Sequence, residues 1–128
     1  MKKVPAKVAK DRTAWGDEFP ACWLCGREEW QLVKPERLEI HEICRCSHSN
    51  DAWDRCNYFR ACTECHAGPL DSKAQMPHAL QMAYKLLNDP DNFDLAKWHE
   101  IARRPATYVT REEVDLCIKA MRSVEIGR

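Results

Sequence analysis

Four cysteines occur in two Cys-x-x-Cys pairs, Cys22/Cys25 and Cys62/Cys65, and Gly26 follows the first pair. Each short turn directs two sulfur atoms toward one point, so the two turns together offer a closed tetrahedral set of thiolates. Zinc suits this set because it is a borderline-soft ion without a preferred d-electron geometry. The spacing therefore predicts one structural zinc ion. The alternative is a redox dithiol, but that chemistry expects a βαβ setting, for which this chain offers too few strands.

The other four of the eight cysteines do not fit this ligand pattern. We assign no chemistry to Cys44, Cys46 or Cys56, and we interpret Cys117 as a small core residue on an apolar helical stripe. Residues 1–10 lack an apolar signal core, so export is not expected and the thiols should stay reduced. The cysteines therefore favour metal binding over a disulfide framework.

A second set of chemically capable residues, His41, Asn57 and His66, is spread along the middle of the chain. His41 lies in the run LEIHEI, and His66 directly follows the second cysteine pair in the run NYFRACTECH, which begins at Asn57. Together with the CWLCG run of the first cysteine pair, these segments resemble the HNH nucleases. The Asn-x4-Cys-x2-Cys-His pattern is the most specific part of the resemblance, which covers residues 22–71.

The resemblance implies an α+β fold with a ββα-metal core, in which two strands and one helix surround a single divalent ion beside a four-cysteine zinc site. It implies a DNA endonuclease that hydrolyses phosphodiester bonds by nicking or by double-strand cleavage. Because small single-domain members are common in phages, it also implies a phage-type protein in the host cytoplasm, a monomer or weak dimer, with DNA and phage packaging or replication proteins as partners. The alternative is a catalytically inactive zinc-bound module that binds DNA or a protein.

By the same resemblance, His41 and His66 are the ligands of the catalytic ion, expected to be Mg²⁺ or Mn²⁺. Asn57 carries over as the residue that orients the catalytic loop, which suits an amide because it donates and accepts at once. Glu42 stands where the family often has a histidine that acts as general base. A carboxylate with a reference pKa of about 4.3 is ionised at neutral pH and can accept a proton. Alternatively, Glu42 binds the metal and His41 is the base.

Two features limit this site. Residues 41 and 42 of a regular strand face opposite sides, so both act in one site only if the strand ends or bulges there. A third ligand that some family members carry falls on Leu70, which cannot bind a metal, although Asp71 is close enough to substitute. With two protein ligands the ion would be held weakly.

Three arginines flank the site and are candidates for contacts to DNA: Arg45, Arg55 and Arg60.

The elements that must position these residues follow from periodicity. Alternation and branched residues predict strands near 37–43 and 57–61. Apolar residues at three- and four-residue spacing predict three helices in the last third of the chain, each with its own start signal. These signals are Pro77, Asp94 and the capping box of Thr110 and Glu113.

The chain divides into an irregular basic arm at 1–21, a zinc-bound HNH core at 22–75 and a helical extension packed on the core at 76–128. The buried face of the first helix of the extension is expected to consist of Ala79, Leu80, Ala83, Leu86 and Leu87.

Composition sets the limits of this interpretation. The 128 residues suit one domain, and 45% are hydrophobic. No apolar run reaches the length of about 20 residues that a membrane-spanning helix needs. The formal net charge is zero, with 20 basic and 20 acidic residues. Tight, charge-driven binding of nucleic acid is therefore not expected, and contacts to DNA must depend on local patches and on bound metal.

Overall fold

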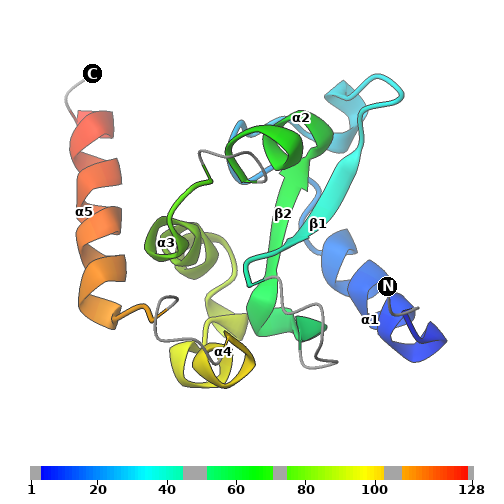
Figure 1. The fold of residues 1–128 in the computed structure, drawn as a ribbon. Helices are drawn as coiled ribbons and strands as arrows, with labels where there is room; N and C mark the ends of the chain where they lie inside the picture. Colours follow the sequence, from blue (N-terminus) through cyan, green and yellow to red (C-terminus); the bar gives the residue numbers. More distant parts are fainter. Residues whose placement is uncertain (1–3, 45–51, 71–74, 103–107, 127–128) are drawn as a thin grey trace.

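The computed structural model describes residues 4–44, 52–70, 75–102 and 108–126. They form a mixed α+β fold in which a two-stranded sheet lies between helices from both ends of the chain (Figure 1). The helices are α1 (Ala6–Asp17), α2 (Thr63–Cys65), α3 (His78–Asn88), α4 (Leu95–Ala102) and α5 (Arg111–Ile126), and the strands are β1 (Leu38–Glu42) and β2 (Tyr58–Cys62). No helix among the described residues has the length and apolar character needed to cross a membrane.

Both predicted strands are present, each end within one residue of its expected position, and together they form a hairpin. They pair antiparallel in a regular register that runs from Leu38 opposite Cys62 to Glu42 opposite Tyr58. Side chains of such a strand alternate between the two faces of the sheet. Glu39 and His41 therefore share one face of β1, and Glu42 lies on the other.

The N-terminal arm is helical, so the prediction of an irregular segment over residues 1–21 was wrong in this part. Pro5 is the N-cap residue of α1, and Pro20 lies beyond its end, so the prolines bound the helix instead of preventing it. Trp15 anchors α1: its side chain is fully buried, and its ring packs edge-on against those of Trp23 and Tyr58. Tertiary burial of one aromatic side chain thus stabilises a helix with weak amphipathic character.

The helix starts predicted for the C-terminal region are confirmed. Helix α3 begins directly after Pro77, and the carboxylate of Asp94 accepts a 3.0 Å hydrogen bond from the backbone N–H of Lys97 at the start of α4. Thr110 and Glu113 form the capping box of α5, in which the Glu113 N–H donates to the Thr110 hydroxyl at 3.1 Å and the Thr110 N–H donates to the Glu113 carboxylate. These short-range signals determine where each helix begins.

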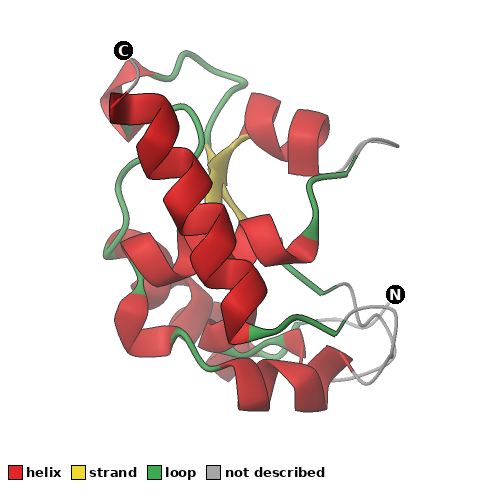
Figure 2. Ribbon diagram, turned by 90° about the vertical axis from the view of Figure 1, so that its left-hand side faces the viewer, coloured by secondary structure: helices red, strands yellow, loops and turns green. Residues whose placement is uncertain are grey.

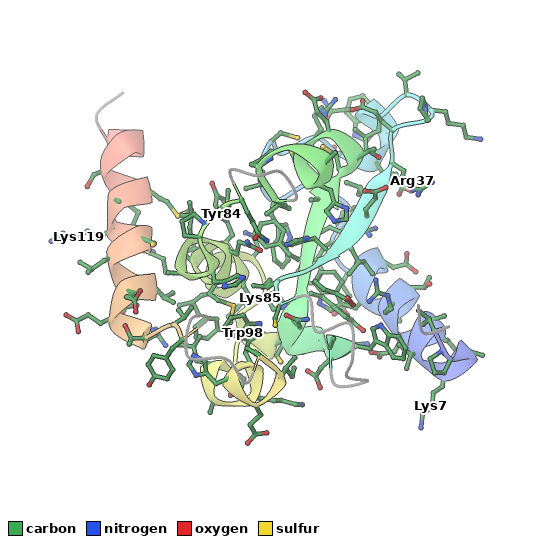
Figure 3. All side chains as sticks on the ribbon, viewed as in Figure 1. Lys7, Arg37, Tyr84, Lys85, Trp98 and Lys119 are labelled. Atoms are coloured by element: carbon green, nitrogen blue, oxygen red, sulfur yellow. The ribbon has the colours of Figure 1, made fainter. Side chains whose placement is uncertain are left out.

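The face of α3 that is buried differs from the prediction. Leu87 is 43% exposed, whereas the polar residues Gln81 and Lys85 are fully buried. Helix α3 lies between the hairpin and α5, so it is covered on two sides (Figures 1 and 2). In Figure 3, Lys85 lies inside the molecule, whereas Lys119 projects outward from α5. The apolar stripe in the sequence predicts one buried face of α3, and it gives no indication of the second face, which carries the polar residues.

The buried ammonium group of Lys85 joins α3 to β2. Its Nζ donates to the carbonyl oxygens of Arg55 at 2.6 Å and Tyr58 at 2.8 Å and to the carboxylate of Asp89 at 2.8 Å. The same Asp89 carboxylate accepts a 2.9 Å hydrogen bond from the indole N–H of Trp15. All three donors of the ammonium are thereby satisfied, which is the condition for burying such a charge.

We predict that Lys85→Met destabilises the protein by about 3 kcal/mol, because the carboxylate of Asp89 would be left buried without its cation. Chemical unfolding of the metal-loaded protein, followed by circular dichroism, measures this loss. Lys97→Met is the matched control, since Lys97 makes an ion pair with Asp54 at the surface, where its side chain is 55% exposed. The control should change stability by less than about 1 kcal/mol. Equal effects of the two variants would contradict the structural role of Lys85.

His78, the first residue of α3, makes stability depend on pH. Burial lowers the pKa of His78 below its ordinary value of 6.5, and a hydrogen bond to the carbonyl of Ile43 opposes this only in part. The unfolded chain therefore binds this proton at a higher pH than the folded chain does. Stability should fall as the pH falls through 6.5 toward the lower pKa of the folded state. His78→Gln should lose less stability than the wild type between pH 7.5 and 5.5, and parallel curves for the two proteins would contradict this assignment.

Candidate functional site

The four paired cysteines meet at one point. The sulfur atoms of Cys22, Cys25, Cys62 and Cys65 all lie within 4.8 Å of one another, and this group can bind a metal ion such as zinc. The first pair lies on a tight turn that leaves through Gly26 with a φ of 76°, a conformation that glycine adopts without strain. The second pair spans the end of β2 and the single turn of α2. The cluster thus joins three segments of the chain.

Arg27 supports this cluster and was not predicted from the sequence. Its guanidinium donates to the sulfur atoms of Cys25 at 3.4 Å and Cys62 at 3.3 Å. Burial alone would raise the pKa of Cys25, but the hydrogen bonds from Arg27 and the other cysteines outweigh it and lower the pKa to about 6. Burial raises the pKa of Cys22 and of Cys65. The cluster therefore already favours the thiolate, the form that binds metal, at Cys25.

We predict one tightly bound zinc ion per chain, measured by elemental analysis of the purified protein. Cys25→Ala should lose most of the zinc and unfold at a lower temperature, because metal binding to such a site contributes directly to folding. Cys117→Ser is the matched control, since Cys117 lies on α5 outside the cluster and should leave the zinc content unchanged. Replacement by Co²⁺ should give the absorption of a tetrahedral thiolate site in the wild type and in Cys117→Ser. Full zinc content in Cys25→Ala would refute the assignment.

The two histidines singled out in the sequence lie side by side. The ring centroids of His41 and His66 are 5.1 Å apart, and the ring planes meet at 71°. His41 comes from β1 and is almost fully buried, whereas His66 directly follows α2 and is partly exposed. Two elements distant in sequence therefore bring two imidazoles together, and their role as metal ligands stays a prediction.

Each imidazole has an oxygen acceptor beside one of its ring nitrogens. Nε2 of His41 lies 2.9 Å from Oε1 of Gln81, and Nδ1 of His66 lies 2.8 Å from Oε1 of Glu39. When these nitrogens carry the ring protons, the lone pairs lie on Nδ1 of His41 and Nε2 of His66. Histidines that bind metals are oriented in this way. Neither acceptor was predicted from the sequence. Glu39 could have been identified as a neighbour of the histidine site, because it lies two residues before His41 and therefore on the same face of the strand.

The buried side chain of Asn57 joins the backbone after β1 to the backbone before β2. Its side-chain oxygen accepts hydrogen bonds from the Cys44 N–H at 2.8 Å and the Trp98 indole at 2.9 Å. Its side-chain nitrogen donates to the carbonyl oxygens of Cys44 at 3.0 Å and Ala52 at 3.1 Å. The amide is fully buried, and it donates and accepts at once, as expected of a residue that bridges two backbone groups. Asn57 therefore holds the backbone of Cys44 close to that of Ala52.

Glu42 does not join the two imidazoles. The hairpin pairing stays regular through Glu42 opposite Tyr58, so the strand has no bulge there and residues 41 and 42 face opposite sides. The carboxylate of Glu42 instead forms a 3.3 Å ion pair with Arg12 of α1. Burial raises the pKa of Glu42, and the Arg12 guanidinium opposes this shift. The structure thus separates the carboxylate expected as general base from the histidine pair.

The remaining candidates differ in their surroundings. Arg45 and Asp71 lie outside the described residues. Arg55 forms ion pairs with two carboxylates of the N-terminal segment, those of Asp11 at 2.8 Å and Glu18 at 3.2 Å. Leu70, at the position where the resemblance would place a third ligand, is fully buried in the core.

Arg60 is half-buried between β2 and α1. Its Nε donates to the carbonyl of Phe19 at 3.0 Å, and its guanidinium lies so close to Gly16 that a Cβ there would approach Nη1 to 3.0 Å. Burial lowers the pKa of Arg60, and Glu29 and Asp17 oppose this shift. Arg60 thus serves to join α1 to the hairpin, and its guanidinium reaches the wall of a groove.

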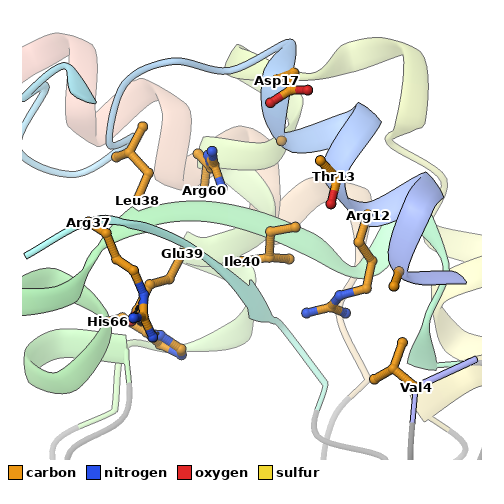
Figure 4. A pocket seen from close by; sticks show the side chains of 12 residues that line it. Val4, Arg12, Thr13, Asp17, Arg37, Leu38, Glu39, Ile40, Arg60 and His66 are labelled. Carbon is orange, nitrogen blue, oxygen red and sulfur yellow. Dashed lines mark hydrogen bonds and ion pairs between the residues drawn. The ribbon is translucent and has the colours of Figure 1, made fainter. Parts of the chain in front are cut away.

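This groove lies between α1 and β1 and has a volume of about 620 Å³ (Figure 4). Its charged and polar walls come from α1, from β1 and the residue before it, from β2 and from the segment after α2. They include Arg12, Thr13, Asp17, Arg37, Glu39, Arg60 and His66. Cationic and anionic side chains are mixed along it, and the pair of Glu39 and His66 borders one side. Of the two imidazoles, His66 is the one that this groove reaches.

Comparisons with protein-family models, curated proteins and solved structures find no match to this chain.

Proposed function

We propose that this protein is a divalent-metal-dependent DNA endonuclease of the HNH type, with His41 and His66 as the protein ligands of the catalytic ion. The observation that carries the proposal is the 5.1 Å separation of the two rings, each held at one nitrogen by an oxygen acceptor. Such acceptors fix the tautomer and raise the basicity of the other ring nitrogen. The residues present therefore fit a divalent ion.

The four-cysteine cluster is assigned to a structural zinc ion in this proposal. Four thiolates close the coordination sphere of zinc and leave no position for substrate. Among the described residues the histidine pair offers two ligands, so that water and phosphate oxygens could complete the coordination sphere of its ion. When bound, such an ion polarises the scissile phosphate and lowers the pKa of a coordinated water.

The chain's own residues provide the rest of the site. Asn57 holds the backbone at Cys44, after β1, and at Ala52, and Glu39 orients His66. The groove between α1 and β1 gives a DNA strand a path to His66, with Arg12 and Arg37 on its walls. Because the formal net charge is zero, binding along this path should be weak without the ion.

We predict that the protein nicks supercoiled plasmid when Mg²⁺ or Mn²⁺ is added and not when both are omitted. His66→Ala should lower the rate about 100-fold or more, since it removes a ligand of the ion that stabilises charge on the phosphate. Glu39→Gln should lower it about 10-fold, because it weakens the hold on His66. His78→Gln is the control, a histidine replaced outside the site, and it should nick at the wild-type rate.

Two outcomes would overturn the endonuclease proposal: equal nicking by the wild type and His66→Ala, which points to a contaminant, and no nicking by any of the proteins. The zinc content of each variant is measured in parallel, so that loss of activity is not confused with loss of the zinc cluster. Glu42→Gln, assayed alongside, decides whether the carboxylate on the α1 side takes up a proton in the reaction.

A second candidate is a zinc-bound module that binds DNA or a protein without cleaving DNA. It is favoured by the ion pair of Glu42 with Arg12, which holds the expected general base away from the histidine pair, and by the burial of Leu70 at the position where some HNH nucleases carry a third ligand. DNA retardation in a gel, without nicking under any metal condition, would support this candidate.

A further inference from the structure

Gln81 is a fully buried polar residue on α3, beyond the segment that resembles the HNH nucleases. We propose that Gln81 is a positioning residue that fixes the ring orientation and tautomer of His41. Helix α3 of the C-terminal region thereby contributes to the histidine site. A catalytic consequence of this contact rests on the proposed function, but the orientation of the ring can be measured in the absence of any activity.

The orientation of the Gln81 amide is determined by a second partner. Its Nε2 donates to the carbonyl oxygen of Met76 at 2.8 Å, and its Oε1 lies 2.9 Å from Nε2 of His41. If the amide were reversed, its oxygen would face the Met76 carbonyl, and two acceptors would meet in a buried place. The amide oxygen therefore faces His41, and Nε2 of His41 must donate.

This assignment places the proton of a neutral His41 ring on Nε2 and its lone pair on Nδ1. The ring cannot rotate about its χ2 axis to exchange its nitrogens without leaving the Gln81 oxygen unpaired inside the protein. Gln81 thus selects both the tautomer and the orientation of a ligand that is itself almost fully buried. A ligand with only one available orientation loses less entropy when it binds an ion.

The same contacts connect α3 to the segment that carries the second histidine. The backbone N–H of Met76 donates to the carbonyl of Pro69 at 2.8 Å, and Pro69 lies in the helical turn His66–Leu70. A continuous chain of hydrogen bonds therefore leads from the His41 ring through Gln81 and Met76 to the turn that begins with His66. The two imidazoles are set relative to each other by α3 as well as by the hairpin.

The neighbours of Gln81 on α3 indicate that packing alone does not require an amide here. Met82 and Ala83, the next two residues, are fully buried and apolar. A buried amide is costly unless all of its groups are paired, so an apolar side chain would be the simpler choice for stability. The polar side chain has partners on both of its ends, and one of them is the candidate ligand.

The test uses the full-length, zinc-loaded protein and two variants. Gln81→Leu removes the acceptor at similar size, and Met82→Leu alters packing on the same helix. Long-range ¹H–¹⁵N spectra report which ring nitrogen of His41 carries the proton. We expect Nε2–H in the wild type and in Met82→Leu, and a mixture of tautomers in Gln81→Leu.

The second measurement is binding of Mn²⁺ alone, followed by electron paramagnetic resonance. Gln81→Leu should weaken Mn²⁺ binding about 10-fold, the typical effect of removing an outer partner of a metal-binding histidine, and Met82→Leu should leave it within about 2-fold. Loss of Mn²⁺ affinity in Met82→Leu equal to that in Gln81→Leu would mean that packing alone is responsible, and would overturn the proposal.

The spectra also overturn the proposal if the wild-type ring carries its proton on Nδ1, or if Gln81→Leu leaves the tautomer of His41 unchanged. Absence of Mn²⁺ binding in the wild type would instead refute the metal site of the proposed function. In that case the comparison of tautomers still decides whether Gln81 positions His41, so the two failures can be told apart.

Discussion

The convergence of four cysteine sulfurs is the constraint on which the histidine site depends. The cluster joins the turn at Cys22 and Cys25 to the end of β2 and to α2, and His66 is the residue after its last member. The position of His66 therefore follows from that of Cys65. Four sulfur atoms so close together would repel one another if all were thiolates, and Arg27, which donates to two of them, supplies one positive charge. A divalent cation in the cluster would stabilise the hairpin end and, through it, the place where the two imidazoles meet.

The C-terminal helices complete the arrangement through buried polar side chains. Gln81 contacts the ring of His41, Lys85 donates to the backbone at β2, and the Trp98 indole donates to Asn57. Each of these contacts joins a helix of the C-terminal region to a residue in or beside the hairpin. Buried polar groups specify a single geometry because any other leaves a donor or acceptor unpaired. The helices thus do more than cover an apolar surface: they set the orientation of side chains in the candidate site.

The features that could be predicted from the sequence are those with short-range signals. The Cys-x-x-Cys turns, the two strands and the capping residues Asp94 and Thr110 depend on neighbours a few positions away, and all lie where expected. The features that were missed depend on partners distant in sequence. Helix α1 is stabilised by the burial of Trp15 in the core. Gln81 is a polar residue type that usually lies at the surface, and its burial depends on contact with His41 of β1, which is distant in sequence. Glu42 was assigned by its position next to His41, although strand alternation and Arg12 place it on the opposite side.

The two candidate metal sites differ in the way that their proposed roles require. The cysteine cluster has four ligands of one kind that surround a point, so an ion there is closed off and serves stability. The histidine pair has two ligands, and a groove reaches one of them, so an ion there would keep positions for water and for a phosphate oxygen. Weak and exchangeable binding follows from the small number of ligands. Glu39 and Gln81 hold both rings in fixed orientations. The side chains therefore lose little conformational entropy when the ion binds, which offsets part of the weak affinity. A fixed pair of imidazoles, one of them reached by an open groove, is thus the feature that distinguishes the proposed hydrolytic site from the cysteine cluster.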